Sequence, residues 1–299
     1  MQLTLATAQY PITAFEQFSQ WQLHIGEWVA HAAEQGAGLL LFPEYGAMEL
    51  SSLLPEAEQH DLRLQVGGLD RLKDDFIGTF ESLARQWGVW IVAPSLPVGE
   101  GDKVLNRAYV FSKNGLAGYQ DKWFMTRFEN EEWGVAAGLP QLKLFETAWG
   151  AFGIQICYDV EFPVGAQWLC AAGANLVLAP SCTETIRGAT RVHVGARARA
   201  LENQCYVAVS QTVGEAPWSP AVDVNYGYAA IYATPDLGLP EEGIVARRTP
   251  QQPGWLIQHL DFNHISTVRK DGQVFNFQDQ QLLHTLYKGQ APEIVRIGA

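Results

Sequence analysis

Residues 150–159 read Gly-Ala-Phe-Gly-Ile-Gln-Ile-Cys-Tyr-Asp, and this stretch decides how the rest of the chain is interpreted. Its apolar first part predicts a buried strand, and polar residues and Pro163 follow soon after the cysteine. Cys157 is therefore expected at the C-terminal tip of a core strand, where open α/β sheets hold their chemistry. A thiol in that place can act as a nucleophile if bases and cations converge on it.

Two other segments place charged side chains directly after a predicted strand. Residues 40–45 read Leu-Leu-Phe-Pro-Glu-Tyr, and residues 118–123 read Gly-Tyr-Gln-Asp-Lys-Trp. If these strands share a sheet with the cysteine strand, Glu44 and Lys122 come close to the thiol. The sequence therefore raises the hypothesis that a carboxylate, an amine and a thiol form one reactive group.

The composition indicates a single folded domain that does not bind nucleic acid. Apolar residues make up 47% and charged residues 17% of the 299 residues, which is enough for a large core. The net charge is 20 − 32 = −12, without long runs of one sign. Because phosphate contacts require clustered Lys and Arg, we expect a small-molecule substrate and no nucleic-acid partner.

Cysteine usage and the first residues indicate a cytoplasmic protein. The 4 cysteines are too few for a disulfide framework, and none form a Cys-x-x-Cys pair. Residues 1–10 lack the basic flank of a signal peptide. No apolar run approaches the ~20 residues that span a bilayer. We therefore expect reduced thiols in the cytoplasm and no membrane partner.

Predicted strands and helices alternate along the chain, which is typical of an α/β fold. Helices are expected at 15–34, 70–87, 163–172 and 189–203, and strands at 2–9, 39–42, 89–93, 107–112, 116–119, 142–145, 175–179, 206–210, 228–233, 243–248 and 254–260. Residues 48–68 and 123–140 read as loops, and residues 262–278 show no regular period. No Ser/Gly/Pro linker divides the chain. We expect one α/β domain over 1–262, with a two-layered β core and helices outside, and a C-terminal extension over 263–299 that packs on this domain or on a partner subunit.

Five segments together resemble the nitrilase superfamily, the carbon–nitrogen hydrolases. They are Phe-Pro-Glu at 42–44, Asp-Lys at 121–122, Ile-Cys-Tyr-Asp at 156–159, Gly-Ala-Asn-Leu-Val-Leu-Ala-Pro-Ser at 173–181 and Arg-Ala-Arg-Ala-Leu-Glu-Asn at 197–203. Each is short, but they occur in the family's order, and the resemblance runs from residue 1 to about 262. It implies a four-layer α-β-β-α sandwich that pairs across a dimer, so we expect a homodimer or a higher homo-oligomer.

The resemblance also implies a Glu-Lys-Cys catalytic triad, which maps to Glu44, Lys122 and Cys157. The three residue types suit the chemistry of acyl transfer. Glu44 would take the thiol proton and later give it to the leaving amine. Cys157 would form a thioester, and Lys122 would stabilise the oxyanion together with the backbone N–H of Tyr158. This chemistry requires no metal and no cofactor.

A second glutamate commonly lies between the lysine and the cysteine in this family, several residues before a glycine. Glu131 lies seven residues before Gly138 and matches this spacing, with Glu132 and then Glu129 as the alternatives. Glu131 is expected to position the substrate amide nitrogen and to hold Lys122 in place.

Four residues next to these positions are expected to contact the substrate. Trp133 belongs to a Trp-rich segment that either lines the pocket or packs in the core. The set expected to bind substrate is Tyr45, Glu132, Trp133 and Tyr158.

The residues after the cysteine indicate the bond that is cleaved. Tyr158-Asp159 resembles the amidase branches, whereas nitrilases proper usually have Trp-Glu there. Glu161 stands where several amidases with acidic substrates carry arginine, which argues against an ω-amidase. We therefore expect hydrolysis of a small carboxamide to an acid and ammonia. An N-carbamoyl amide hydrolase or a nitrilase is the enzymatic alternative, and an oligomeric binding protein without activity is the alternative from another class.

Overall fold

The computed structural model describes residues 1–287 and 293–297 of the chain. The strands are β1 (Gln2–Pro11), β2 (Leu39–Leu41), β3 (Trp90–Val92), β4 (Leu96–Glu100), β5 (Lys103–Ser112), β6 (Gly115–Asp121), β7 (Val135–Ala136), β8 (Phe145–Thr147), β9 (Gly150–Ile154), β10 (Leu176–Ser181), β11 (Tyr206–Glu215), β12 (Val224–Asn225), β13 (Ala230–Tyr232), β14 (Ile244–Arg247) and β15 (Gly254–Asp261). The helices are α1 (Phe18–Glu34), α2 (Glu56–Gln59), α3 (Leu62–Asp70), α4 (Lys73–Trp87), α5 (Pro163–Ala171), α6 (Ile186–Asn203), α7 (Phe262–Asp271) and α8 (Asn276–Tyr287). Three short helical turns are η1 (Gly46–Leu53), η2 (Glu129–Trp133) and η3 (Cys157–Glu161).

The strands form one strongly curled sheet whose two halves meet at β1. The main path through the sheet is β4-β5-β3-β2-β1-β11-β10-β9-β8. β1 pairs in parallel with β2 through residues 5–7 and with β11 through residues 9–11, and it pairs antiparallel with β15. The sheet can therefore fold over at β1, which brings the ends of β2, β6, β9 and β10 toward one site.

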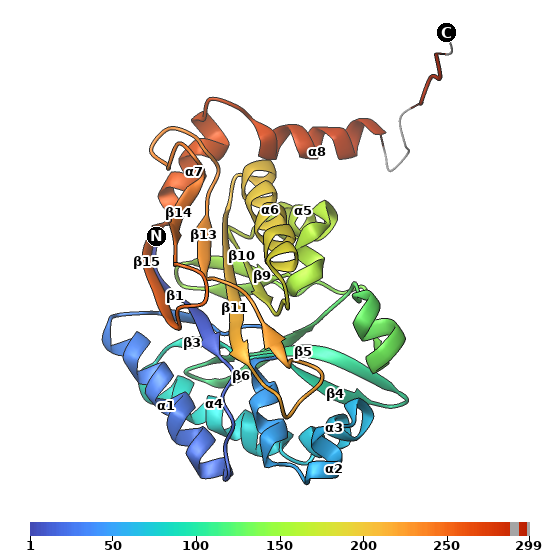
Figure 1. Cartoon of the computed structure of the whole chain (residues 1–299). Helices are drawn as coiled ribbons and strands as arrows, with labels where there is room; N and C mark the ends of the chain where they lie inside the picture. Colours follow the sequence, from blue (N-terminus) through green and yellow to red (C-terminus); the bar gives the residue numbers. More distant parts are fainter. Residues whose placement is uncertain (288–292, 298–299) are drawn as a thin grey trace.

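Helices cover the outer face of each half, which gives the α-β-β-α sandwich. Figure 1 shows α1 and α4 together at the bottom, below β3 and β6, and α5 and α6 at the upper right beside β9 and β10. The alternation along β2 explains the layers, since successive side chains point to opposite faces of a strand. Leu40 packs in the cluster that contains the helices α1 and α4, whereas Leu39 and Leu41 belong to the core shared with the other half. The expected fold class is confirmed.

The interpretation of residues 48–68 as a loop is wrong. This region contains η1, α2 and most of α3, and several of its apolar side chains are buried. Leu50 is fully buried and Val66 and Leu69 lie against the domain, while Asp61 caps α3 by accepting hydrogen bonds from two backbone N–H groups. The strand β4 was also missed, because its last residues are polar and it follows β3 after a short turn. Short helices in polar sequence give little periodic signal, so packing rather than propensity decides their structure.

Residues 262–278 contain the helix α7 and the first residues of α8, although the sequence showed no regular period there. α7 begins after its cap Asp261 and buries Phe262, Ile265 and Val268 on one face. Arg269 of α7 donates to the carbonyl oxygens of Asn203 and Gln204, at the negative end of α6, and to that of Ala174 after α5.

The helix α7 therefore packs on the body of the domain. The prediction for the C-terminal extension covers residues 263–299, of which 288–292 and 298–299 lie outside the described residues. Within the part of the chain that the structure describes, no helix has the length and apolar character needed to cross a bilayer.

Candidate active site

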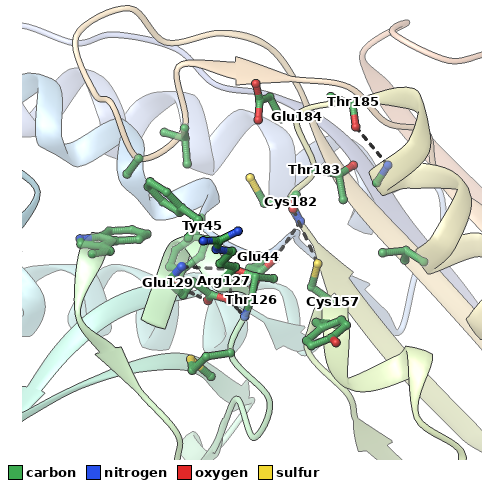
Figure 2. Close-up of a pocket in the computed structure, with 18 of the residues that line it drawn as sticks. Glu44, Tyr45, Thr126, Arg127, Glu129, Cys157, Cys182, Thr183, Glu184 and Thr185 are labelled. Atoms are coloured by element: carbon green, nitrogen blue, oxygen red, sulfur yellow. Dashed lines mark hydrogen bonds between the residues drawn. The ribbon is translucent and has the colours of Figure 1, made fainter. Parts of the chain in front are cut away.

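One cavity of about 600 Å³ opens where the strands β2, β6, β9 and β10 end. Its buried floor consists of Glu44, Lys122, Glu129 and Cys157, and we call these four residues the floor. Each of them follows a strand directly or lies in a short turn, so the sheet fixes the position of its backbone. Figure 2 shows Cys157 and Cys182 side by side, with Glu44 reaching toward the backbone of Cys182.

Lys122 joins two carboxylates at the bottom of the cavity. Its Nζ lies 2.8 Å from Oε1 of Glu44 and 2.6 Å from Oε2 of Glu129. All three side chains are at least 97% buried, so their attraction is screened little by water. The result is a fixed triad of charges, in which one ammonium lies between two acids.

Glu44 connects this charge triad to the cysteine. Its second oxygen, Oε2, accepts a hydrogen bond of 2.9 Å from the backbone N–H of Cys182. The thiol of Cys157 donates to the carbonyl oxygen of Cys182 at 3.6 Å, and the carboxyl group of Glu44 is near enough to raise the pKa of the thiol. The thiol of Cys157 is therefore linked to Glu44 through the backbone of Cys182, and Glu44 contacts the ammonium of Lys122 directly.

Cys157 sits in a strained turn rather than in the strand itself. β9 ends at Ile154, and Cys157 begins η3 with a φ of 48°, in the left-handed region that non-glycine residues rarely adopt. Asp159 holds this turn to the lysine loop. Its carboxylate accepts hydrogen bonds from the backbone N–H groups of Trp123, Phe124 and Ile156, so the residues around Lys122 and Cys157 are tied to one side chain.

The pKa shifts follow from burial and from the shared ammonium. Burial raises the pKa of Glu44 above 4.5, an effect that Lys122 opposes and the charge of Glu129 reinforces. For Glu129 the pKa is lowered, because the ammonium of Lys122 and the donors of Thr126 and Tyr45 outweigh the effect of burial. Burial also raises the pKa of the Cys157 thiol well above 9.0, and the nearby Glu44 raises it further. The resting site thus holds a neutral thiol beside a carboxyl group whose affinity for protons is increased.

Glu129, and not Glu131, holds Lys122, which corrects the expected position of the second glutamate. The side chain of Glu131 is about half exposed and pairs with Arg127 at 2.7 Å, and Glu132 is also exposed and does not line the cavity. The turn η2 explains the difference. Residues two apart point to different sides of a helical turn, and of the three glutamates in η2 only Glu129 is buried.

Three of the four residues expected to contact substrate line the cavity. They are Tyr45, Trp133 and Tyr158, and Glu132 is the exception. The hydroxyl of Tyr45 donates to Oε1 of Glu129 at 2.7 Å, and its ring lies 4.8 Å from that of Trp133 between ring centres. The rings of Tyr45 and Trp133 form one apolar wall beside the charged floor.

Sequence reasoning missed the residues that support the floor from behind. Asn106 donates to Glu44 and Glu129, and Ser95 donates to Asn106. Thr126 donates to Glu129 from both its backbone N–H and its hydroxyl. The available signal was weak: Asn106 is a polar residue between apolar ones in the buried part of β5.

The outer part of the cavity carries charges in a different arrangement. Five charged residues line it, and we call them the rim: Arg127, Glu161, Glu184, Arg191 and Asp223. Arg191 lies 3.5 Å from Glu161, and its own side chain is 64% exposed. Arg191 is therefore solvated, and its ion pair with Glu161 is longer than those of the floor.

Comparisons with known proteins agree on one family. The family model described as "Carbon-nitrogen hydrolase" matches residues 4–270. "Probable hydrolase YhcX" of Bacillus subtilis (strain 168) is 32% identical over 286 residues, which cover 95% of this chain and 55% of that protein. This chain therefore spans about half the length of that relative. "Deaminated glutathione amidase" of Bos taurus is 26% identical over 274 residues, covering 87% of this chain and 77% of that protein.

A solved structure shows the same fold. The carbon-nitrogen hydrolase from Helicobacter pylori G27 aligns with a TM-score of 0.76 at 16% sequence identity, covering 96% of this chain and 98% of that chain. At this identity the likeness concerns the arrangement of helices and strands alone.

Proposed function

This chain belongs to the carbon–nitrogen hydrolase family, and on that premise we propose that it is an amidase that hydrolyses a small carboxamide to a carboxylic acid and ammonia. The observation that carries the proposal is the position of Lys122 between Glu44 and Glu129, with the Cys157 thiol in the same cavity and joined to Glu44 through the backbone of Cys182. Acyl transfer requires a nucleophile, a general base and a group that stabilises the oxyanion, and a thiol with a nearby carboxylate and a fixed cation supplies all three.

In the first half-reaction Cys157 attacks the carbonyl carbon of the amide. Its proton passes to Glu44 as the S–C bond forms, because the thiol is neutral at rest and needs a base in contact with it. The carbonyl oxygen becomes an oxyanion, which Lys122 and the backbone N–H of Tyr158 stabilise. One such donor contributes about 3–4 kcal/mol to the transition state. The C–N bond then breaks, Glu44 returns the proton to the nitrogen, and ammonia leaves a thioester on Cys157.

In the second half-reaction water replaces ammonia. Glu44 takes a proton from the water molecule as its oxygen attacks the thioester carbon. The C–S bond breaks, the proton returns to the sulfur, and the carboxylic acid leaves. The raised pKa of Glu44 suits both directions of this transfer, since a carboxyl group with an ordinary pKa is a weak base near neutral pH.

Glu129 takes one of the two roles that the sequence had suggested for Glu131, the fixing of Lys122. Its ionised carboxylate pairs with Lys122 and lines the cavity. Both of its oxygens already accept hydrogen bonds, from Tyr45 and Asn106 and from Lys122 and Thr126, so it holds the lysine rather than the amide nitrogen of the substrate. The residues Tyr158 and Asp159, which resemble the amidase branches, support an amide over a nitrile. The name of the Bos taurus relative also supports an amidase.

The test is a panel of small amides, nitriles and N-carbamoyl compounds, assayed for ammonia release. We expect turnover of amides, a mass increase on the Cys157 peptide that corresponds to the acyl group, and loss of both in Cys157→Ala. Cys170→Ala is the matched control, because Cys170 is buried in the core outside the cavity. Ammonia release that persists in Cys157→Ala contradicts the proposal. Binding of amides without turnover by the unsubstituted protein favours the inactive binding protein instead.

We also propose that the protein is a cytoplasmic homodimer or a higher homo-oligomer. Large apolar side chains on the outer surface of α5 and α6 support this proposal, because they would be covered by a second copy: Trp168, Ile186 and Val194. Light scattering coupled to size exclusion tests it. A mass equal to one chain of 33.1 kDa contradicts the oligomer.

A further inference from the structure

We infer that Asn106, held in place by Ser95, is a positioning residue that directs the thiol proton of Cys157 to one oxygen of Glu44. The inference rests on the proposed function, because it assigns a role in the proton transfer from Cys157 to Glu44. Neither Asn106 nor Ser95 lines the cavity, and both side chains are fully buried behind the floor.

The amide of Asn106 bridges the same two carboxylates as Lys122. Its Nδ2 donates to Oε1 of Glu44 at 2.8 Å and to Oε1 of Glu129 at 3.3 Å. A neutral donor between two acids lowers their mutual repulsion without adding a charge. It therefore favours the ionised form of both carboxylates, in the same direction as the ammonium.

The orientation of this amide follows from its neighbours. The backbone N–H of Tyr45 donates to Oγ of Ser95 at 3.0 Å, so the hydroxyl of Ser95 is left to donate its own hydrogen. Ser95 Oγ lies 2.7 Å from Oδ1 of Asn106, which must be the acceptor. The Nδ2 group then has to face the carboxylates, since an inverted amide would place its oxygen against the acceptor Oε1 of Glu44 and its NH2 group against the donating hydroxyl of Ser95.

The bonds to Glu44 decide which oxygen is free to act as the base. Its Oε1 accepts from both Lys122 and Asn106, which occupies the two lone-pair directions of that atom. Its Oε2 accepts from the backbone N–H of Cys182, which leaves one direction open. That backbone segment also carries the carbonyl oxygen next to the Cys157 sulfur. The thiol proton therefore goes to Oε2, and Asn106 keeps the other oxygen turned away.

The test measures the reactivity of Cys157 toward iodoacetamide between pH 4 and 9, so no natural substrate is needed. Asn106→Leu removes the donor while keeping a similar volume. We expect the acid limb of the alkylation rate to move upward by about 1 pH unit, which makes the reaction about tenfold slower below the midpoint. Ser95→Ala keeps the amide but frees its orientation, so we expect a smaller shift in the same direction. With an amide substrate, the loss should appear in kcat rather than in KM.

Asn203→Leu is the matched control. Asn203 is also a buried amide, but it donates to the carbonyl oxygen of Arg199 in α6 and lies outside the cavity. We expect this variant to lower the melting temperature and to leave the acid limb unchanged. The combination of variants separates a loss of folding stability from a change in the titration of the site.

Two results would overturn the inference: one leaves the proposed function standing, and the other removes it as well. If Ser95→Ala and Asn106→Leu keep the acid midpoint of the unsubstituted protein, Asn106 is a structural residue only, while the proposed function stands. If Asn106→Leu does not fold, Ser95→Ala alone decides. If peptide mapping finds that Cys157 of the unsubstituted protein is not alkylated, the proposed function itself fails, and the inference fails with it.

Discussion

The floor and the rim of the cavity use the same kinds of side chain in opposite ways. In the floor, Lys122 is buried between Glu44 and Glu129 at 2.8 and 2.6 Å. In the rim, Arg191 approaches Glu161 at 3.5 Å and remains largely exposed. An ion pair in a buried site is strong and costly to break, whereas a solvated pair contributes at most about 1 kcal/mol. The contrast suggests that the floor performs the chemistry and that the rim selects among substrates.

Replacing Lys122, the cation of the floor, is the strongest test of this difference between floor and rim. Lys122→Met leaves Glu44 and Glu129 buried without a counter-ion. We expect kcat/KM to fall by about 10³-fold or more, and the free energy of unfolding to fall by about 3–5 kcal/mol. Amide turnover and urea unfolding measure the two effects.

The control for this variant is a lysine outside the floor. The ammonium of Lys143 lies 3.6 Å from the ring centre of Tyr119 and does not line the cavity. We expect Lys143→Met to retain activity within about twofold. If Lys122→Met keeps more than a tenth of the activity, the floor is not the catalytic centre.

Two glutamates in the turn η2 allow a second, internally matched comparison. Glu129 belongs to the floor, whereas Glu131 pairs with Arg127 on the surface. We expect Glu129→Gln to lower kcat/KM by about 10²-fold, because the amide cannot hold Lys122 as the carboxylate does. Glu131→Gln should change it by no more than about twofold, as for other exposed pairs. A larger loss in Glu131→Gln than in Glu129→Gln would reverse the assignment made from the structure.

This pair of glutamates also shows where prediction from sequence ends. That Glu44, Lys122 and Cys157 come together could be predicted, because each follows a predicted strand and the five segments that resemble one family occur in its order. Which of the acids in residues 129–132 points inward depends on a single π-helical turn, which no spacing rule anticipates.

The supporting residues were missed for a related reason. The roles of Asn106 and Ser95 depend on the residues that they contact across the sheet. Glu44, for example, is 62 residues from Asn106 in the sequence, so a local pattern does not reveal the contact. The helix α7 was missed although Phe262, Ile265 and Val268 have helical spacing, because three apolar residues in a polar segment are a weak periodic signal. The layers of the fold, in contrast, follow from long apolar elements and could be predicted.

The fall of kcat/KM at acid pH gives a third test of the floor. Glu44 must be ionised to take the thiol proton, and burial raises its pKa above 4.5. As the pH falls through that raised pKa, the base is lost, so we expect the acid midpoint of kcat/KM to lie above pH 4.5.

Unfolding does not explain that loss. The pKa of Glu129 is lowered, so the stability that its charge contributes is present above pH 4.5 and decreases only as the pH falls below that value. Circular dichroism over the same pH range checks that the fold is retained. A midpoint at or below pH 4.5 in a folded protein would mean that Glu44 is not the base.

Removing a charge from the rim should have the smallest effect of these substitutions on stability and kcat, and it should change KM instead. Glu161→Gln removes one negative charge from the cavity wall, and Arg191→Gln removes the positive charge beside it. Because the pair is solvated, we expect each variant to change the free energy of unfolding by less than about 1 kcal/mol and to leave kcat within about twofold.

The effect of removing a rim charge should appear in the KM of a substrate with a charged acyl group. With succinamate, which is anionic, Glu161→Gln should lower KM by roughly threefold and Arg191→Gln should raise it by a similar factor, whereas neutral butanamide should show neither change. At about 1 M salt the differences should vanish, because charges at the rim are then screened over roughly 3 Å. A fall in kcat of more than tenfold in either variant, or a change in KM that persists at high salt, would place these residues with the floor and remove the distinction between the two regions.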